Sequence, residues 1–205
     1  NPLAMQEFES YHSWYFRDFD YDNPDGSEVF VFEGIDTFSE IFLNGELIGT
    51  TDNMLIPHEI KASGLKLGTN ELVVHIFPTC IVARSYEYEA ASFALRYTYE
   101  SLYVRKAAHS FGWDIMPRIV SSGIWRPVSI IKKVPDRIDD AFVFTLSIDR
   151  YYNTAIVSLI YNLSISRDSL KGYSIKFSGV CGQSSFSSEH NLWHTSGRLD
   201  AWIGN

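Results

Sequence analysis

The run Ile41-Phe42-Leu43-Asn44-Gly45-Glu46-Leu47-Ile48 is the strongest local signal of fold in this chain. Asn-Gly between two apolar runs is the preferred two-residue turn of a β-hairpin, because both residues tolerate a positive φ. Further strand-like runs lie on either side of it. Residues 29–32 form a short continuous apolar run, and residues 71–77 are rich in β-branched side chains and end at Pro78. The hairpin therefore predicts an antiparallel β architecture for this part of the chain.

The segment before the hairpin also predicts β structure. Residues 8–19 contain Tyr11, Trp14, Tyr15 and Phe16, and we expect a strand that packs on both of its faces. Asp, Asn, Pro and Gly at positions 22–27 predict a turn after it. A second turn is expected at residues 68–70, where the sequence reads Gly-Thr-Asn.

The strand pattern stops between residues 83 and 108. Glu87, Ala90 and Ala94 tolerate a helix, as do Leu95 and Arg96, so we expect an insertion of short helix or irregular loop. A strand is predicted again at residues 123–131. Its Pro127 lacks a backbone N–H, which favours an edge position for part of that strand.

A polar joint at residues 132–136 (Lys-Lys-Val-Pro-Asp) marks the predicted domain boundary, which gives domains 1–134 and 135–205. Beyond the joint, apolar and polar residues alternate regularly, which predicts an antiparallel sandwich. Three sets of residues are each expected to share one strand face: Phe142, Phe144, Leu146 and Ile148; Val157, Leu159, Tyr161, Leu163 and Ile165; Tyr173, Ile175 and Phe177. Four or five strands are fewer than the roughly seven of an immunoglobulin-like sandwich, so we expect this domain to be truncated. The fold class is therefore all-β.

Composition excludes several classes of function. A net charge of −8 over 205 residues argues against nucleic acid or an anionic membrane as partner, because both attract clustered Lys and Arg. No signal peptide or membrane-spanning segment is visible, and the start of the chain reads as trimmed. Cys80 and Cys181 lie in different predicted domains, so a disulfide is not implied. The six histidines show no metal-ligand spacing, and we predict no metal site.

The run Phe111-Gly112-Trp113-Asp114-Ile115-Met116-Pro117-Arg118 is the candidate site. The face of a Trp packs on the apolar C–H face of a pyranose, and a neighbouring Asp accepts hydrogen bonds from sugar hydroxyls. Trp113 and Asp114 are therefore the predicted sugar-binding residues. Two alternatives remain open: Trp113 fills the core while Asp114 caps a turn, and Arg105 or Arg118 either pairs with Asp114 or is a solvated surface residue.

Several motifs, in order, resemble the N-terminal part of family 2 glycoside hydrolases, most of all the β-mannosidase branch. They are Phe-Glu-Gly-Ile-Asp-Thr at 32–37, Ile-Phe-Leu-Asn-Gly at 41–45, Gly-Thr-Asn-Glu-Leu at 68–72, Val-Arg-Lys-Ala at 104–107, Phe-Gly-Trp-Asp at 111–114 with Pro-Arg at 117–118, and Gly-Ile-Trp-Arg-Pro-Val at 123–128. The resemblance covers the first two-thirds of the chain, and the last third matches only as a pattern of strands.

The resemblance implies a jelly-roll, galactose-binding-like domain, then an immunoglobulin-like sandwich, then a (β/α)8 barrel with two catalytic glutamates. Those glutamates would lie beyond Asn205, so no catalytic residue is expected in this chain. The mechanism implied is retaining and exo-acting on terminal β-linked sugars, without a cofactor. The partners implied are the carbohydrate substrate and the barrel of the same protein, and the compartment implied is periplasmic or secreted.

By resemblance, Asp114 contacts hydroxyls of the terminal sugar and Trp113 stands beside it on a loop that leans onto the barrel. Ile115 and Met116 depart from the usual Trp-Gly. This departure leaves the sugar open between mannose, galactose and glucosamine, and it leaves open a loop that is partly degenerate. Two other functions stay open. One is a stand-alone carbohydrate-binding module, and the other is a β-sandwich adhesion or scaffold protein.

Overall fold

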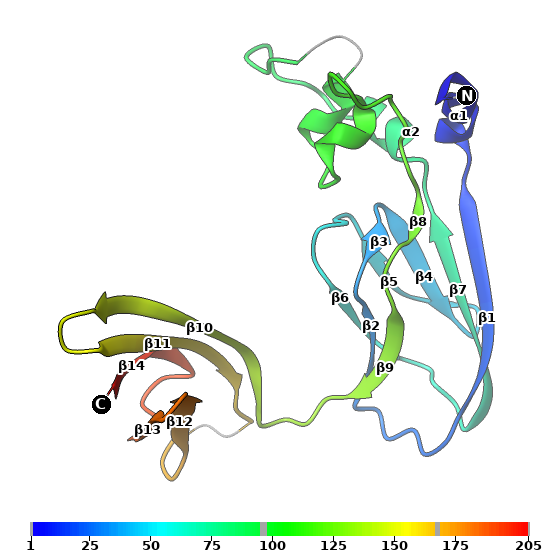
Figure 1. Cartoon of the computed structure of the whole chain (residues 1–205). Coiled ribbons are helices and arrows are strands. Elements are labelled where there is room, and N and C mark those ends of the chain that lie inside the picture. The colour runs from blue at the N-terminus through cyan, green and yellow to red at the C-terminus, as the bar shows by residue number, and fades with distance from the viewer. Residues whose placement is uncertain (1, 95–97, 167–168, 205) are drawn as a thin grey trace. The chain divides into compact units, whose positions relative to one another are not determined.

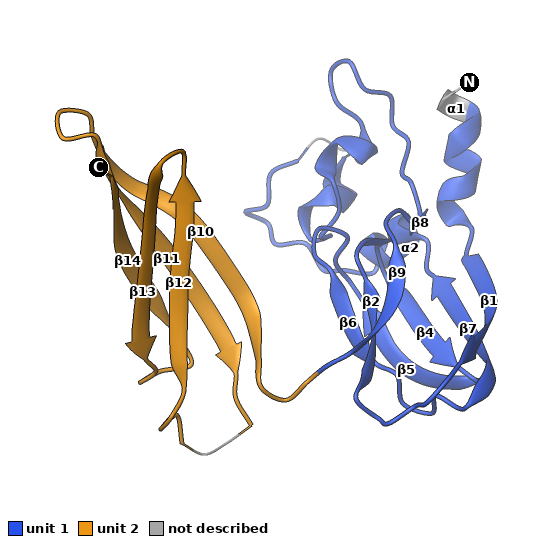
Figure 2. Ribbon diagram, turned by 60° about the horizontal axis from the view of Figure 1, so that its bottom comes forward, with its two compact units in different colours: residues 1–133 blue, residues 134–205 orange. Residues whose placement is uncertain are grey.

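The computed structural model describes residues 2–94, 98–166 and 169–204, and strands predominate in them. The chain divides into two compact units, residues 1–133 and 134–205 (Figure 2). The first unit contains α1 (Pro2–Met5), the 3₁₀ helix η1 (Gln6–Ser10), β1 (Ser13–Tyr21), β2 (Glu28–Phe32), β3 (Ile35–Asp36), β4 (Ser39–Leu43), β5 (Glu46–Thr51), β6 (His58–Lys61), β7 (Gly68–Ile76), α2 (Thr79–Arg84), η2 (Tyr99–Leu102), η3 (Ala108–Phe111), β8 (Gly123–Ile124) and β9 (Val128–Lys132).

Two antiparallel sheets form the body of the first unit (Figure 1). One has the strand order β1-β7-β4-β5, the other has the order β6-β2-β9, and the short pair β3-β8 lies beside them. Their inward-facing side chains make one core: Phe30, Phe32, Ile35, Ile41, Leu43, Ile60, Ala62, Leu72, Val74 and Ile76. The predicted all-β sandwich is therefore confirmed, with residues 29–32 in its central strand.

The predicted hairpin turn lies where the sequence indicates. Asn44 (φ 52°) and Gly45 (φ 86°) connect β4 to β5, both in the left-handed region. The Asn44 amide also donates to the carbonyl of Gly64 and to Oδ1 of Asn70, each at 2.9 Å, and accepts from the N–H of Glu71 at 3.0 Å. The hairpin is thereby tied to the start of β7. The turn predicted at residues 68–70 is displaced, because these residues already begin that strand.

The prediction for residues 8–19 is wrong in two respects. Residues 6–10 form η1, and the strand begins only at Ser13. It pairs with β7 on one side alone and is an edge strand. Trp14 and Phe16 point to the outer face of the sheet, where Phe16 is 67% exposed and Trp14 stacks on the His75 ring at 4.0 Å. Cross-strand stacking on His75 of β7, rather than a second packed layer, accounts for Trp14, and Phe16 stacks in turn on Trp14.

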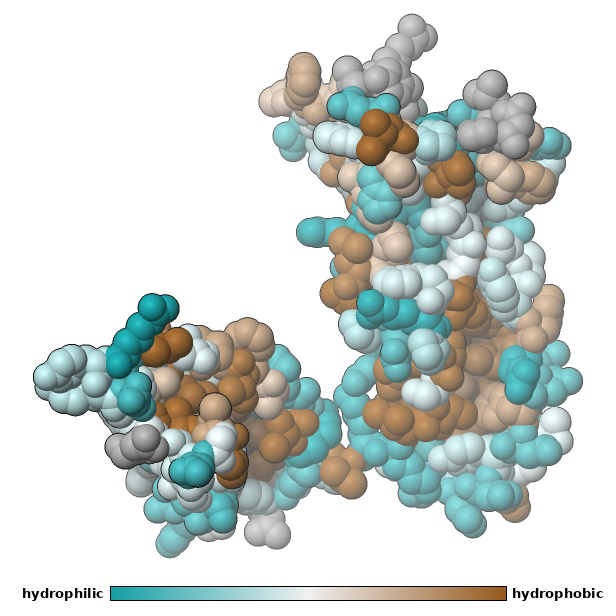
Figure 3. Space-filling model, in the orientation of Figure 1, coloured by the Kyte–Doolittle hydropathy of each residue, from teal (hydrophilic) through white to brown (hydrophobic). Residues whose placement is uncertain are grey.

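A groove of about 480 Å³ opens between β1 and β9, which are each an edge strand of one of the two sheets. Phe30 and Phe32 line it together with Tyr15, and Figure 3 shows hydrophobic side chains gathered there. Its lining is mostly apolar, so it offers a pyranose few hydrogen-bonding partners.

The insertion predicted between residues 83 and 108 is confirmed as irregular loop with short helix. Of the short helices, η2 lies inside these bounds, whereas α2 begins earlier, at Thr79, and η3 ends later, at Phe111. Residues 95–97, which include the predicted Leu95 and Arg96, lie outside the described ranges. The following strand is interrupted at Pro127 and forms β8 and β9, of which β9 is at a sheet edge. This insertion carries the candidate loop at one end of the sandwich (Figure 1).

The second unit contains β10 (Arg137–Asp149), β11 (Thr154–Ser164), β12 (Ser174–Cys181), β13 (Ser184–Asn191) and β14 (Ser196–Gly204). They form two antiparallel sheets, β10-β11-β14 and β12-β13, which pack around Leu159, Tyr161, Leu163, Phe177, Leu192 and Ala201. The faces predicted for residues 157–165 and 173–177 are confirmed, because these residues belong to or pack on this core.

The face predicted for residues 142–148 is wrong. Phe142 and Phe144 stack on each other at 5.8 Å, and Arg198 lies over Phe144. A bulge between Thr145 and Ser147 then shifts the alternation, so that Ile148 lines the groove between the sheets with Val143. Among the described residues of both units, no helix has the length and apolar character needed to cross a bilayer.

Candidate functional site

The Trp113-Asp114 loop is a tight turn that projects from the first unit. The backbone N–H of Trp113 donates to the carbonyl of Met116 at 3.0 Å, and the reverse bond measures 3.1 Å. Asp114 and Ile115 therefore occupy its tip. Gly112, just before it, adopts φ 108°, a conformation that side chains with a Cβ disfavour. The chain can turn outward at this point because residue 112 is a glycine.

All four residues of the turn are exposed. Trp113 is 72% exposed and Ile115 is 89% exposed, whereas Trp is highly buried on average in folded proteins. The alternative in which Trp113 fills the core is therefore wrong. The Asp114 side chain makes no hydrogen bond or ion pair with any other described residue, so it does not cap the turn. Both side chains are free to contact a ligand or another domain.

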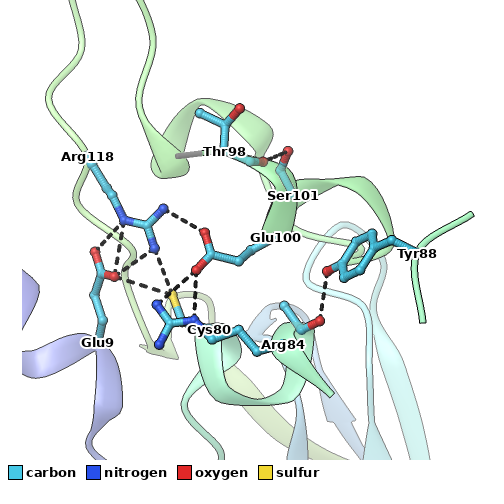
Figure 4. Close-up of polar contacts among 9 residues, drawn as sticks. Glu9, Cys80, Arg84, Tyr88, Thr98, Glu100, Ser101 and Arg118 are labelled. Carbon is cyan, nitrogen blue, oxygen red and sulfur yellow. Dashed lines mark hydrogen bonds and ion pairs between the residues drawn. The ribbon is translucent and has the colours of Figure 1, made fainter. Parts of the chain in front are cut away.

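Four charged side chains support the base of this loop (Figure 4). The guanidinium of Arg118 donates to both carboxylate oxygens of Glu9, with Nε to Oε1 at 2.9 Å and Nη2 to Oε2 at 2.8 Å. Its Nη1 donates to Oε2 of Glu100 at 2.8 Å, and Oε1 of Glu100 accepts from Nε and Nη2 of Arg84 at 3.1 and 3.0 Å. We call Glu9, Arg118, Glu100 and Arg84 the charged cluster. It joins η1, α2 and η2 to the segment that leaves the loop.

The charged cluster holds its arginines in the charged form. Burial alone would lower the pKa of Arg118, but its hydrogen bonds to Glu9 and Glu100 outweigh that effect and raise it. Cys80 lies against the same groups, with its sulfur 3.2 Å from Nη2 of Arg118 and 3.4 Å from Oε2 of Glu9. Burial, and then the charge of Glu9, raise the pKa of the Cys80 thiol to about 12. Cys80 is therefore a neutral thiol at neutral pH and not a nucleophile.

A buried ion pair holds together the chain segments that lead into and out of the loop. The Lys106 ammonium contacts the carboxylate of Asp36 and donates to the carbonyl of Ser121 at 2.9 Å, and the Ser121 hydroxyl donates to Asp36 at 2.8 Å. Both charged side chains are almost completely buried. Burial lowers the pKa of Lys106, and the charge of Asp36 opposes that effect. These contacts fasten residues 106 and 121, on the two sides of the loop, to strand β3.

Trp125 packs on the backbone rather than in a site. A Cβ added at Gly34 would lie 2.6 Å from the Trp125 ring, so only glycine leaves room for the indole there. Arg126 covers the other part of the ring at 4.3 Å from its centroid. This arrangement gives Trp125 a structural role.

Neither predicted arginine pairs with Asp114. Arg118 instead pairs with Glu9 and Glu100. Arg105 is exposed and makes its contacts through the backbone, with its carbonyl accepting from the N–H of Met54 at 2.9 Å. Of the residues that hold the loop, Glu9, Arg84 and Glu100 carry no local signal in the sequence. Their role depends on contacts between segments up to 109 positions apart.

The cysteines Cys80 and Cys181 are both free. No three or more His, Cys, Asp or Glu side chains within the described ranges gather closely enough to hold a metal ion. What the site offers chemically is an exposed indole, an exposed aliphatic side chain and an unengaged carboxylate on a firmly held turn.

Known proteins resemble this chain over the region that contains the first unit and its loop. Residues 1–126 match the family described as glycosyl hydrolase 2 galactose-binding domain-like. Beta-mannosidase B of Thermothelomyces thermophilus is 31% identical over 143 residues, which cover 66% of this chain and 16% of that protein. Beta-mannosidase B of Aspergillus terreus is 32% identical over 113 residues, covering 52% and 13%. The chain thus spans about a sixth or less of the length of these relatives.

Solved structures agree with this match. The crystal structure of beta-D-mannosidase from Dictyoglomus thermophilum superposes with a TM-score of 0.73 at 27% identity, covering 100% of this chain and 26% of that one. A beta-glucuronidase of Bifidobacterium dentium, 17% identical, shares the fold with a TM-score of 0.66 over 96% of this chain and 34% of its own. The predicted galactose-binding-like fold of the first domain is thereby confirmed. With more than half of its length matched by the family, the chain belongs to the glycosyl hydrolase 2 galactose-binding domain-like family.

Proposed function

We propose that this chain is the N-terminal, non-catalytic part of an exo-acting retaining β-glycosidase that removes terminal β-linked sugars. The relatives named as beta-mannosidases make a β-mannoside the first substrate to test. In this proposal the two catalytic carboxylates of a retaining mechanism lie on a (β/α)8 barrel outside the present chain. The first unit acts as a scaffold that presents the Trp113-Asp114 turn to the barrel.

The observation that carries the proposal is the exposure of Trp113 and Asp114 on a turn with a fixed base. An unengaged carboxylate accepts hydrogen bonds from sugar hydroxyls, and such bonds to a charged group are stronger than neutral ones. The face of Trp113 offers an apolar surface to a pyranose ring or to the wall of the barrel. Because the base of the turn is held by ion pairs, these groups lose little freedom on binding.

Ile115 decides which sugars must be compared. It is more exposed than Trp113 and presents an aliphatic surface instead of an aromatic one. We therefore include β-galactosides and β-glucosaminides beside β-mannosides. The substrate with the highest kcat/KM identifies the sugar.

The test is to replace Asp114 by Ala in the full-length protein and to measure kcat/KM on aryl glycosides of these sugars. Loss of a hydrogen bond to a sugar hydroxyl corresponds to about 1–3 kcal/mol, so kcat/KM should fall by about five- to 150-fold. Asp18→Ala is the matched control, because Asp18 is an exposed carboxylate on β1 without a partner among the described residues. Thermal stability should be the same in both variants.

Two results would count against the proposal. Unchanged kinetics in Asp114→Ala would remove Asp114 from the substrate site. Micromolar binding of mannose or β-linked oligosaccharides to the isolated 205-residue chain would favour a stand-alone carbohydrate-binding module, since the turn without a barrel presents only part of a site. We expect that binding to be weak or absent.

A further inference from the structure

We propose that Glu9 is a positioning residue for Asp114 and acts on it through Arg118. The inference rests on the proposed function, since it assumes that Asp114 contacts the substrate. It assigns a role in the site to the N-terminal segment, which lies far from the loop in sequence and contacts no part of its tip.

The Glu9–Arg118 contact is a strong one. Both carboxylate oxygens of Glu9 accept from the planar guanidinium, which is the bidentate geometry that fixes the orientation of an arginine. The side chains are only 10% and 16% exposed, and that of Glu100 is 4% exposed. Solvent and salt therefore screen these pairs much less than they screen ion pairs at the surface.

A short and restricted stretch of backbone connects Arg118 to the turn. Only residues 115–117 separate it from Asp114, and Pro117 restricts the backbone there by fixing its own φ. Beside Arg118, the N–H of Ile119 donates to the carbonyl of Ser110 at 3.0 Å, which closes the stem of the loop. The guanidinium also lies 5.6 Å from the centroid of the buried Phe111 ring. A displacement of Arg118 therefore moves the base on which Trp113 and Asp114 stand.

Glu9 and Glu100 differ in the partners that they bind. Glu100 divides its oxygens between Arg118 and Arg84, so it also ties α2 to η2 and is expected to matter for the whole insertion. Glu9 receives the Arg118 guanidinium and, more weakly, the Cys80 thiol. Replacing Glu9 thus affects the orientation of Arg118 most directly and leaves the contact between Arg84 and Glu100 in place.

A double-mutant cycle in the full-length enzyme tests this role. Glu9→Gln keeps the size of the side chain and removes its charge, and we expect kcat/KM on the best substrate to fall by about five- to tenfold. In an Asp114→Ala background the same change should cause no further loss of kcat/KM, because the carboxylate that Glu9 positions is already absent. Glu7→Gln is the matched control, since Glu7 lies on the same short helix and its carboxylate accepts a hydrogen bond from the exposed Tyr11 rather than from Arg118.

The cycle separates positioning from general damage to the fold. A loss of the same size in both backgrounds, or no loss in either, would overturn the inference. Glu9→Asp retains the charge on a shorter side chain and should recover part of the activity. It also serves as the test variant if Glu9→Gln does not fold.

A second measurement does not depend on catalysis. In the ¹⁵N-labelled 205-residue chain, the indole N–H resonance of Trp113 is assigned through Trp113→Phe. Glu9→Gln should shift or broaden it, while Glu7→Gln leaves it in place. If Asp114→Ala is silent in the kinetic assay, the proposed function fails, and this resonance still reports on the turn. If Glu9→Gln leaves both the resonance and the kinetics unchanged, the positioning role fails and the role of Asp114 stands.

Discussion

The buried ion pair between Lys106 and Asp36 is expected to contribute strongly to the stability of the first unit. Lys106→Met would leave the Asp36 carboxylate buried with only hydroxyl partners, Thr37 and Ser121. Breaking a buried pair in this way costs about 3–5 kcal/mol, and the free energy of unfolding in urea should fall by that amount. The double variant Lys106→Met/Asp36→Leu should recover a large part of it, because no unpaired charge remains. A double variant as unstable as the single one would contradict this account.

The two cysteines should differ sharply in reactivity. Cys181 is exposed and Cys80 is buried with its pKa raised, so Ellman's reagent at pH 8 should modify one thiol in the native chain and two in denaturant. The raised pKa of Cys80 also makes the stability of the folded chain depend on pH. The unfolded chain releases this proton near pH 9 and the folded chain near pH 12, so the contribution of Cys80 is present below pH 9 and is lost as pH rises to 12. Cys80→Ala should flatten that alkaline decline.

At the scale of elements, Asn70 joins the hairpin to β7. Both polar atoms of its buried side-chain amide are hydrogen-bonded. Its Oδ1 accepts from the N–H of Lys66 and from the Asn44 amide, and its Nδ2 donates to the carbonyls of Lys66 and Gly68. Asn70→Leu would leave several of these groups without partners in a buried place, and we expect a loss of about 2–4 kcal/mol by chemical denaturation. Thr69→Leu, one residue away and exposed, is the control and should change stability by less than about 1 kcal/mol.

Elements set by local chemistry were predictable, and those set by distant contacts were not. Asn44 and Gly45 determine their turn by their own φ preferences, and the apolar alternation of residues 157–165 identifies a buried face. The bulge at Thr145 lies within a regular pattern that gives no sign of it. The aromatic-rich sequence around Trp14 predicts a strand buried on both faces. Trp14 nevertheless lies on an exposed face, because its stacking partner is His75 of another strand. Within the site, the turn could be located from its motif, but its charged support could not.

At the scale of the whole molecule, the two units should differ in stability. The second is small, and a groove of about 820 Å³ runs between its sheets, with Val180 and Ile148 strongly exposed. A small domain with an open core buries too little apolar area to be more than marginally stable. In urea, we expect it to unfold at a lower concentration than the first unit.

Tryptophan fluorescence can follow that difference. Trp193 and Trp202 report on the second unit, and replacing both by Phe should remove the early transition while the later one remains. If the unsubstituted chain already shows one transition, and the double variant keeps its midpoint and cooperativity, the units do not unfold separately.

The contact between η1 and the loop has a practical consequence for where this protein can be cut. A fragment that begins at Ser13 keeps every strand of the first unit and every residue of its sheet core. It also lacks the carboxylate that orients Arg118. Such a fragment would look intact by circular dichroism, because all its strands remain, while its loop would have lost part of its support. Strand boundaries are therefore a misleading guide to where the support of this loop begins, because that support includes residue 9.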